Sequence, residues 1–237
     1  MTASNLAETF AARPPLALMR GMGTAEPRTE GTRRTLNVLV ALVGIVIAAP
    51  VMALVALLIK LTSPGPVFFA QTRVGLDRRD PADRGNGRRL LDLGGKPFRI
   101  YKFRTMYVQK KTEQVWASQD DPRVTSVGRV LRKYRLDELP QLFNVLLGDM
   151  NIVGPRPEQP GIAADLQKQI TLYNLRHKVR PGITGWAQIN HHYDQSIEDV
   201  RRKVSLDLEY IKRQSLTEDL KIMLRTVPVV VLRKGGW

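Results

Sequence analysis

The stretch from Val38 to Ile59 constrains this chain more than any other feature, because it carries no charged residue over 22 positions. Crossing the hydrocarbon core of a bilayer takes about 20 apolar residues in a helix. A helix buried in a soluble core rarely stays uncharged and apolar on all of its faces for this length. We therefore predict a membrane helix, and we expect the rest of the chain to work beside it.

Pro50 and the flanking charges indicate how this segment meets the membrane. Proline inside a helix removes one backbone donor and clashes with the preceding turn, which kinks the helix. Basic residues stand at both ends, Arg33 and Arg34 before the segment and Lys60 after it. A spanning helix normally carries its Lys/Arg excess on one side only. The pattern favours a helix over residues 36–62 that is kinked at Pro50 and re-enters on the same face; a spanning helix is the alternative.

The charge and the cysteine content limit the function classes. The formal net charge is +15, which in a soluble protein would suggest nucleic acid. Beside a membrane segment the same charge suits anionic lipid headgroups and phosphorylated substrates, so we expect no nucleic-acid partner. The chain has no cysteine, which excludes disulfides and thiolate metal sites.

The segments on either side of the membrane helix differ in character. Residues 1–35 contain three prolines, several glycines and no lasting periodicity, so we predict a loose tail. Residues 63–237 are predicted to form the catalytic domain. It opens with the turn Ser63-Pro64-Gly65-Pro66 and a short strand, which precede a charged loop over residues 76–95.

A second strand is predicted over residues 97–106, where apolar and basic residues alternate imperfectly. Lys102 and Arg104 lie two positions apart and so share one face of that strand. Basic residues on a strand usually form a solvated face. These two could instead bind a diphosphate.

An acid pair, Asp137 and Glu138, follows in a predicted two-helix segment. The first helix is expected from Ser126 to Tyr134, and the second from Asp137 or Glu138 to about Leu147. Pro140 supports that start, since proline is tolerated in a first turn. Acids at helix starts are commonly no more than caps. Beside a basic cluster and a membrane segment, however, one carboxylate can attack phosphorus and a second can hold Mg²⁺.

Several motifs resemble those of one family, in the expected order. RLDELPQLFNVLLGDMNIVGPRP spans residues 135–157, KFRTM spans residues 102–106, and PGITGWAQIN spans residues 181–190. The turn and strand SPGPVFFAQTRVG, residues 63–75, match as well. The chain from Ser63 to Trp237 is thereby similar to the bacterial sugar transferases that are monotopic polyprenyl-phosphate phosphoglycosyl transferases.

The resemblance implies a fold, a place and a reaction. The fold would be α/β, mostly helical with a few short strands. A re-entrant membrane helix would carry a compact cytoplasmic domain with amphipathic helices in the interface. Such enzymes work at the cytoplasmic face of the bacterial inner membrane. They transfer a sugar-1-phosphate from a UDP-sugar to undecaprenyl phosphate, release UMP, and so begin exopolysaccharide or glycoconjugate assembly.

The resemblance also implies residue roles. Asp137 would be the nucleophile that carries the phosphosugar covalently, which gives ping-pong kinetics. Glu138 would be the main protein ligand of Mg²⁺, with Asp137 beside it. The phosphate-binding candidates are four basic residues, of which Arg104 and Arg156 rank first because each lies within a matched motif: Lys102, Arg104, Arg135 and Arg156.

One departure and several alternatives stay open. Many family members have Ser-Pro at the kink, whereas this chain has Ala49-Pro50. Asp207 and Tyr210 match a D-x-x-Y spacing of the family, but a polar surface pair is an adequate alternative. The chain could also be an inactive relative that binds lipid or serves as a scaffold. The residues do not identify the sugar, which could be glucose, galactose or a HexNAc. They also leave open whether the protein forms a homodimer.

Overall fold

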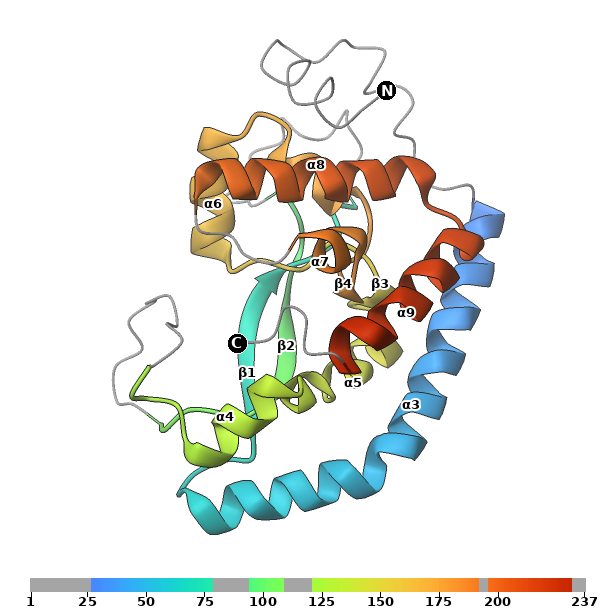
Figure 1. Ribbon diagram of the computed structural model, residues 1–237. Helices are drawn as coiled ribbons and strands as arrows, with labels where there is room; N and C mark the ends of the chain where they lie inside the picture. The colour runs from blue at the N-terminus through green and yellow to red at the C-terminus, as the bar shows by residue number, and fades with distance from the viewer. Residues whose placement is uncertain (1–26, 79–93, 109–120, 192–195, 232–237) are drawn as a thin grey trace.

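The computed structural model describes residues 27–78, 94–108, 121–191 and 196–231. This part of the chain is mostly helical with a few short strands, as predicted (Figure 1). In chain order the elements are α3 (Pro27–Thr62), β1 (Phe68–Val74), β2 (Pro97–Phe103), α4 (Ser126–Lys133), a 3-10 turn (Leu136–Glu138), α5 (Gln141–Leu147), β3 (Asn151–Val153), α6 (Pro160–Gln169), a 3-10 helix (Tyr173–Lys178), β4 (Gly182–Thr184), α7 (Trp186–Asn190), α8 (Ile197–Arg213) and α9 (Leu216–Val231).

Helix α3 contains the apolar segment and is longer than predicted. It begins at Pro27, so residues 27–35, which we expected in a loose tail, are helical. The most apolar 18-residue window within its stretch from Glu30 to Thr62 has a mean hydropathy of 2.9, and only 11% of that window is buried. Within the described residues it is the one helix long and apolar enough to cross a membrane. The helix changes direction partway along its length (Figure 1), and Pro50 lies in its interior.

The N-terminal part of α3 is fastened to the domain by polar contacts. Arg33 donates from Nε to Asp219 Oδ2 at 2.9 Å and from Nη2 to the hydroxyl of Tyr210 at 3.0 Å. Asn37 accepts the backbone N–H of Ile152 at 2.6 Å. These side chains are all buried, so this end of the helix is part of the protein core.

The C-terminal part of α3 is fastened to the same domain. Val55 and Ile59 are buried and pack with Phe103 of β2 and Leu131 of α4. Beyond the helix, Arg104 binds the turn at Ser63. Both ends of the predicted membrane helix therefore contact one domain.

Two small sheets build the framework between the helices. β1 and β2 pair antiparallel, from Phe68 opposite Phe103 to Val74 opposite Pro97. β3 and β4 pair parallel, and they share one hydrophobic cluster with side chains of α3, α5, α8 and α9. The two strands of the first sheet follow the β-branched and aromatic runs that the sequence predicted.

The acid pair lies in a different local structure from the predicted one. Helix α4 runs from Ser126 as expected, although its N-cap is Thr125, whose hydroxyl accepts the N–H of Gly128 at 2.9 Å. The following helix, however, begins at Gln141 with Pro140 as its N-cap. Asp137 and Glu138 belong to a separate 3-10 turn before it. The predicted position of these acids in the first turn of α5 was wrong.

Candidate active site

The 3-10 turn that bears the acid pair is set up by an unusual backbone conformation at Arg135. This residue has φ 54° and ψ 21°, and among the described residues it is the one non-glycine with positive φ. Left-handed geometry is uncommon for residues with a Cβ, and it costs about 1–3 kcal/mol. It ends the run of α4 and turns the chain inward. Asp137 and Glu138 are consequently both buried, each 8% exposed.

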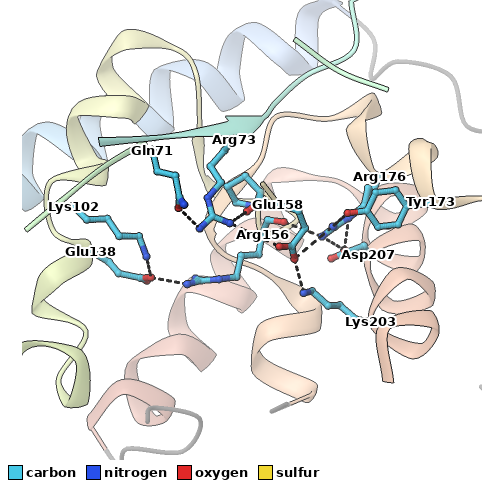
Figure 2. A network of polar contacts seen from close by, with 11 residues as sticks. Gln71, Arg73, Lys102, Glu138, Arg156, Glu158, Tyr173, Arg176, Lys203 and Asp207 are labelled. Carbon is cyan, nitrogen blue, oxygen red and sulfur yellow. Dashed lines mark hydrogen bonds and ion pairs between the residues drawn. The ribbon is translucent and has the colours of Figure 1, made fainter. Parts of the chain in front are cut away.

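Three basic side chains converge on Glu138. Lys102 Nζ and Arg156 Nη2 both donate to Oε1, each at 2.7 Å (Figure 2). Arg135 Nη1 lies 3.8 Å from the other oxygen, Oε2. Burial alone would raise the pKa of Glu138, but Arg156 and Lys102 outweigh it and hold that pKa well below its usual range. Glu138 is therefore a permanent anion at neutral pH.

Asp137 has a different environment although it is the next residue. Burial raises the pKa of its carboxyl above the usual aspartate value, against the pull of Lys102, and the charge of Glu138 adds to the rise. Among the described residues, no hydrogen-bond donor lies on its carboxylate. Two neighbouring carboxyl groups whose pKa values are driven apart are suited to different chemical roles. Of the two carboxyl groups, Asp137 is the one without a hydrogen bond from the described residues.

The backbone that carries Arg156 is held by a buried arginine. Arg176 Nη2 donates to the carbonyl of Arg156 at 2.9 Å and to Asp207 Oδ2 at 2.7 Å (Figure 2). Arg176 Nη1 also donates to the hydroxyl of Tyr173 at 3.1 Å. Arg176 and Asp207 are each 2% exposed, so the contact is fully desolvated. It fixes the Gly-Pro-Arg-Pro turn that aims Arg156 at Glu138.

Glu158 extends this network on the other side of the turn. Its carboxylate accepts from Lys203 Nζ at 2.8 Å, with Arg176 at 3.9 Å and Arg73 at 3.8 Å. Burial would raise the pKa of Glu158, but Lys203 and Arg176 outweigh it and lower it to about 2. The network links β1 and α8 to the turn at Arg156.

The sequence missed this supporting network. Asp207 and Tyr210 were identified by their spacing, but the reading of them as a polar surface pair is wrong, because both are buried. Asp207 pairs with Arg176, and Tyr210 donates to Asp219 at 2.7 Å. Arg73 lies within the SPGPVFFAQTRVG motif, which could have singled it out. Nothing local marks Arg176, whose partner lies 31 residues away.

Of the four predicted phosphate-binding residues, three are brought together and one is not. Lys102, Arg135 and Arg156 surround Glu138. Arg104 instead donates to the carbonyl oxygens of Pro64 at 2.6 Å and Ser63 at 2.8 Å, and it is 4% exposed. The prediction that Lys102 and Arg104 act together on one diphosphate therefore does not fit the geometry.

The turn that Arg104 binds also depends on a glycine. Gly65 has φ 119°, and a Cβ at this position would lie 2.1 Å from Nη1 of Arg104. The glycine and the arginine thus pack as one unit at the exit of α3. Arg104 holds this exit instead of facing the acid pair.

The acid pair could hold a magnesium ion. No group of three or more potential metal-ligating side chains occurs in the described part of the chain, which argues against an all-protein metal site there. Mg²⁺ is commonly bound by one or two carboxylates together with substrate phosphates and water. Asp137 supplies a carboxylate that receives no hydrogen bond from the described residues, and Oε2 of Glu138 faces Arg135 at 3.8 Å. These oxygens fit such an ion.

The described part of the chain thus combines one apolar helix of membrane length with a buried acid pair among clustered cations. The sequence comparison identifies the family. The chain belongs to the bacterial sugar transferase family, whose profile matches residues 28–233. The resemblance inferred from the motifs is thereby confirmed.

Three relatives illustrate what the chain is similar to. The UDP-N-acetylgalactosamine-undecaprenyl-phosphate N-acetylgalactosaminephosphotransferase of Aeromonas hydrophila is 44% identical over 205 residues, which are 86% of this chain and 44% of that protein. The UDP-glucose:undecaprenyl-phosphate glucose-1-phosphate transferase of Caulobacter vibrioides is 43% identical over 208 residues, 86% of this chain and 72% of that protein. The exopolysaccharide production protein ExoY of Rhizobium meliloti is 32% identical over 245 residues, 97% of this chain and 98% of that protein.

The relatives differ in length and in the sugar in their names. The chain spans less than half of the Aeromonas protein, and 39% of a UDP-glucose:undecaprenyl-phosphate glucose-1-phosphate transferase of Escherichia coli that it matches at 43% identity. One name specifies N-acetylgalactosamine and others glucose, at nearly the same identity. Overall similarity therefore does not select a donor sugar.

Proposed function

We propose that this protein is a phosphoglycosyl transferase that moves a sugar-1-phosphate from a UDP-sugar to undecaprenyl phosphate and releases UMP. The observation that carries the proposal is the split acid pair, with Glu138 held as an anion among Lys102, Arg135 and Arg156 and Asp137 left without a hydrogen-bond donor. The names of the relatives support the donor class and the acceptor.

In the first half-reaction the carboxylate of Asp137 attacks the phosphorus that bears the sugar. A bond forms between the Asp137 oxygen and this phosphorus, and the bond from phosphorus to the bridging oxygen breaks. The bridging oxygen keeps the electron pair and leaves as part of UMP. The sugar phosphate stays on Asp137 as an acyl phosphate, which splits one difficult transfer into two easier ones.

In the second half-reaction a phosphate oxygen of undecaprenyl phosphate attacks the same phosphorus. The bond between phosphorus and Asp137 breaks, and the carboxylate takes back its electron pair. The product is a sugar joined to the lipid through a diphosphate. Because UMP leaves before the lipid reacts, the kinetics are expected to be ping-pong.

The cationic cluster suits the charge of these substrates. Lys102 and Arg156 already lie 2.7 Å from Glu138, so phosphate oxygens beside that carboxylate would meet charged donors that cost little to reorganise. A Mg²⁺ ion held by Glu138 and Asp137 would supply further positive charge to the diphosphate. Attraction to anionic substrates outweighs repulsion from the acid pair because the cations outnumber the acids. Lys102, Arg135 and Arg156 surround Glu138, and Arg132 also acts on Asp137.

The same arrangement favours a re-entrant helix. A straight α-helix of 36 residues would separate its ends by about 54 Å. In α3 both ends contact the catalytic domain, through Arg33 at one end and Ile59 at the other. A helix that crossed the bilayer would leave its ends on opposite sides. We therefore propose that α3 dips into one leaflet and returns, with the domain on the cytoplasmic face of the inner membrane.

The function is tested by UMP release from a panel of UDP-sugars, with purified full-length protein, Mg²⁺ and no lipid acceptor. We expect a burst near one UMP per protein molecule with one donor, and none in Asp137→Asn. Asp165→Asn, which changes an exposed acid on α6, is the matched control and should keep the burst. Release that requires undecaprenyl phosphate from the start would contradict the covalent route. Release from no donor, with or without lipid, would identify an inactive relative.

A further inference from the structure

A cleft of ≈ 290 Å³ lies beside the acid pair, and Glu138 is one of its lining residues. Its charged lining residues are Arg135 and Glu138. Elsewhere its wall is mostly apolar, from the 3-10 turn, α5, β4, α7 and α9: Leu136, Leu139, Leu142, Ile183, Ile189 and Val229. A mostly apolar cleft that also has charged lining groups fits a ligand that has a hydrocarbon part and a charged head.

The two threonine hydroxyls on the wall of the cleft already have partners within the protein. The hydroxyls of Thr184 and Thr226 bond to each other at 2.8 Å, and Thr226 also bonds the carbonyl of Ile222 at 2.8 Å. Gln188 donates from Nε2 to the carbonyl of Ile183 at 3.4 Å, and its amide oxygen is buried with no hydrogen-bond partner among the described residues. A nucleobase would need donors and acceptors here, because burying its polar edge without them is costly. A hydrocarbon chain needs none.

The surroundings of the cleft indicate contact with lipid. Helix α9, which contributes Thr226 and Val229, also exposes Leu220, Leu224 and Val227. Tyr134, which also lines the cleft, is 40% exposed. Large apolar side chains that remain exposed around an apolar cleft suit a membrane interface, where amphipathic elements bury them in the headgroup region.

The two oxygens of Glu138 divide the cations into two sets. Lys102 and Arg156 donate to Oε1, while Arg135 faces Oε2 at 3.8 Å and lines the cleft. Resting on the proposed function, we propose that the cleft binds the first isoprene units of the polyprenyl phosphate acceptor, and that Arg135 holds the acceptor phosphate. Lys102 and Arg156 then serve the donor diphosphate on the opposite side of Glu138.

The test fills the cleft and measures the two half-reactions separately. Val229→Trp places a large side chain in the cleft, and Val227→Trp, two residues away at a position 59% exposed, is the matched control. Full-length protein in lipid nanodiscs is given UDP-sugar and Mg²⁺ for the UMP burst. Undecaprenyl phosphate is then titrated to obtain its KM.

We expect Val229→Trp to keep the UMP burst and to raise the KM for undecaprenyl phosphate about tenfold, the equivalent of about two lost methylene contacts. Val227→Trp should match the wild type in both. An unchanged acceptor KM in Val229→Trp would overturn the proposal. So would a raised KM for the UDP-sugar, which would assign the cleft to the nucleoside.

Two further controls keep this result separate from other failures. If Val229→Trp does not fold, as judged by its melting temperature, Val229→Phe is measured in its place against the same outcomes. A wild-type protein without any UMP burst would count against the proposed covalent function, and not against the cleft as a lipid site. In that case the binding of a fluorescent polyprenyl phosphate still tests the cleft. We expect weaker binding to Val229→Trp than to Val227→Trp, and equal binding would refute the assignment.

Discussion

At the scale of single residues, Asp137 and Glu138 show how neighbours with equal exposure acquire different properties. The left-handed backbone at Arg135 and the short 3-10 turn direct the two side chains to different surroundings. Glu138 meets Lys102 and Arg156, whereas Asp137 receives no hydrogen bond from the described residues. A charged form that is costly to bury also reacts readily, so Asp137, as the proposed nucleophile, would gain reactivity at the expense of stability.

This cost leads to a prediction about pH and stability. Because burial raises the pKa of Asp137, the folded state binds that proton more tightly than the unfolded state, and stability is lost as pH rises through the raised pKa. Asp137→Asn removes the charge, so we expect a higher melting temperature than the wild type at pH 7. The gain should shrink as the pH falls below the pKa of Asp137. A melting temperature below that of the wild type at pH 7 would contradict this.

Glu138 should behave in the opposite way. Its lowered pKa means that its charge stabilises the fold above the pKa of an unfolded glutamate, and that this contribution disappears as pH falls through the lowered value. Glu138→Gln leaves Lys102 and Arg156 without their anion, so we expect a loss of about 1–3 kcal/mol in unfolding free energy at pH 7. Glu198→Gln, an exposed acid on α8, should change it by only a few tenths. Urea unfolding in detergent measures both.

The sequence could identify which residue types belong to the site, but not which arginine does what. Arg104 and Arg156 were ranked equally because each lies in a matched motif. Arg156 reaches Glu138, while Arg104 is engaged by the turn at Ser63 and Pro64. The difference depends on which partners the fold brings within about 3 Å, and these lie 18 to 41 positions away along the chain. The local sequence pattern does not indicate which of these distant residues becomes the partner of each arginine.

At the scale of elements, the buried pair of Arg176 and Asp207 connects α8 and the 3-10 helix to the turn at Arg156. Removing one partner of a buried ion pair leaves the other charge uncompensated, which typically costs about 3–5 kcal/mol. We expect Arg176→Met to lose this amount in a urea titration, and to raise the KM for the UDP-sugar at temperatures where it remains folded. Arg202→Met, at an exposed position of α8, is the control. Full stability in Arg176→Met would show that the network is dispensable.

Helices and strands themselves were largely predictable, and the exceptions have physical causes. The two strands around residues 68–74 and 97–103, and helix α4, follow hydrophobic periodicity and caps. The start of α3 does not, because residues 27–35 have no apolar repeat. Contacts with distant residues hold this part of the helix in place. Arg33, for example, donates to Asp219, which lies 186 positions away. The start of α5 was misplaced because a left-handed Arg135 cannot be read from sequence.

At the scale of the whole molecule, the topology of α3 is open to a direct measurement. The chain has no cysteine, so a single introduced cysteine can be labelled without background. Gly31, where an added Cβ meets nothing within 4 Å, and the exposed Thr62 are suitable positions near the two ends. In intact cells we expect neither cysteine to react with an impermeant maleimide, and both to react after the inner membrane is permeabilised. Labelling of one end before permeabilisation would establish a spanning helix.

The attachment of both ends of α3 bears on how this protein can be divided. In a modular membrane enzyme the anchor is a tether, and cutting it releases a working soluble part. Here Arg33 and Asn37 complete the core beneath β3 and α9, and Val55 and Ile59 complete it beneath β2 and α4. A version cut at Ser63 would lack pieces of its own interior. The apolar helix and the domain therefore share one core. Replacing α3 by an unrelated helix would require a redesign of that core.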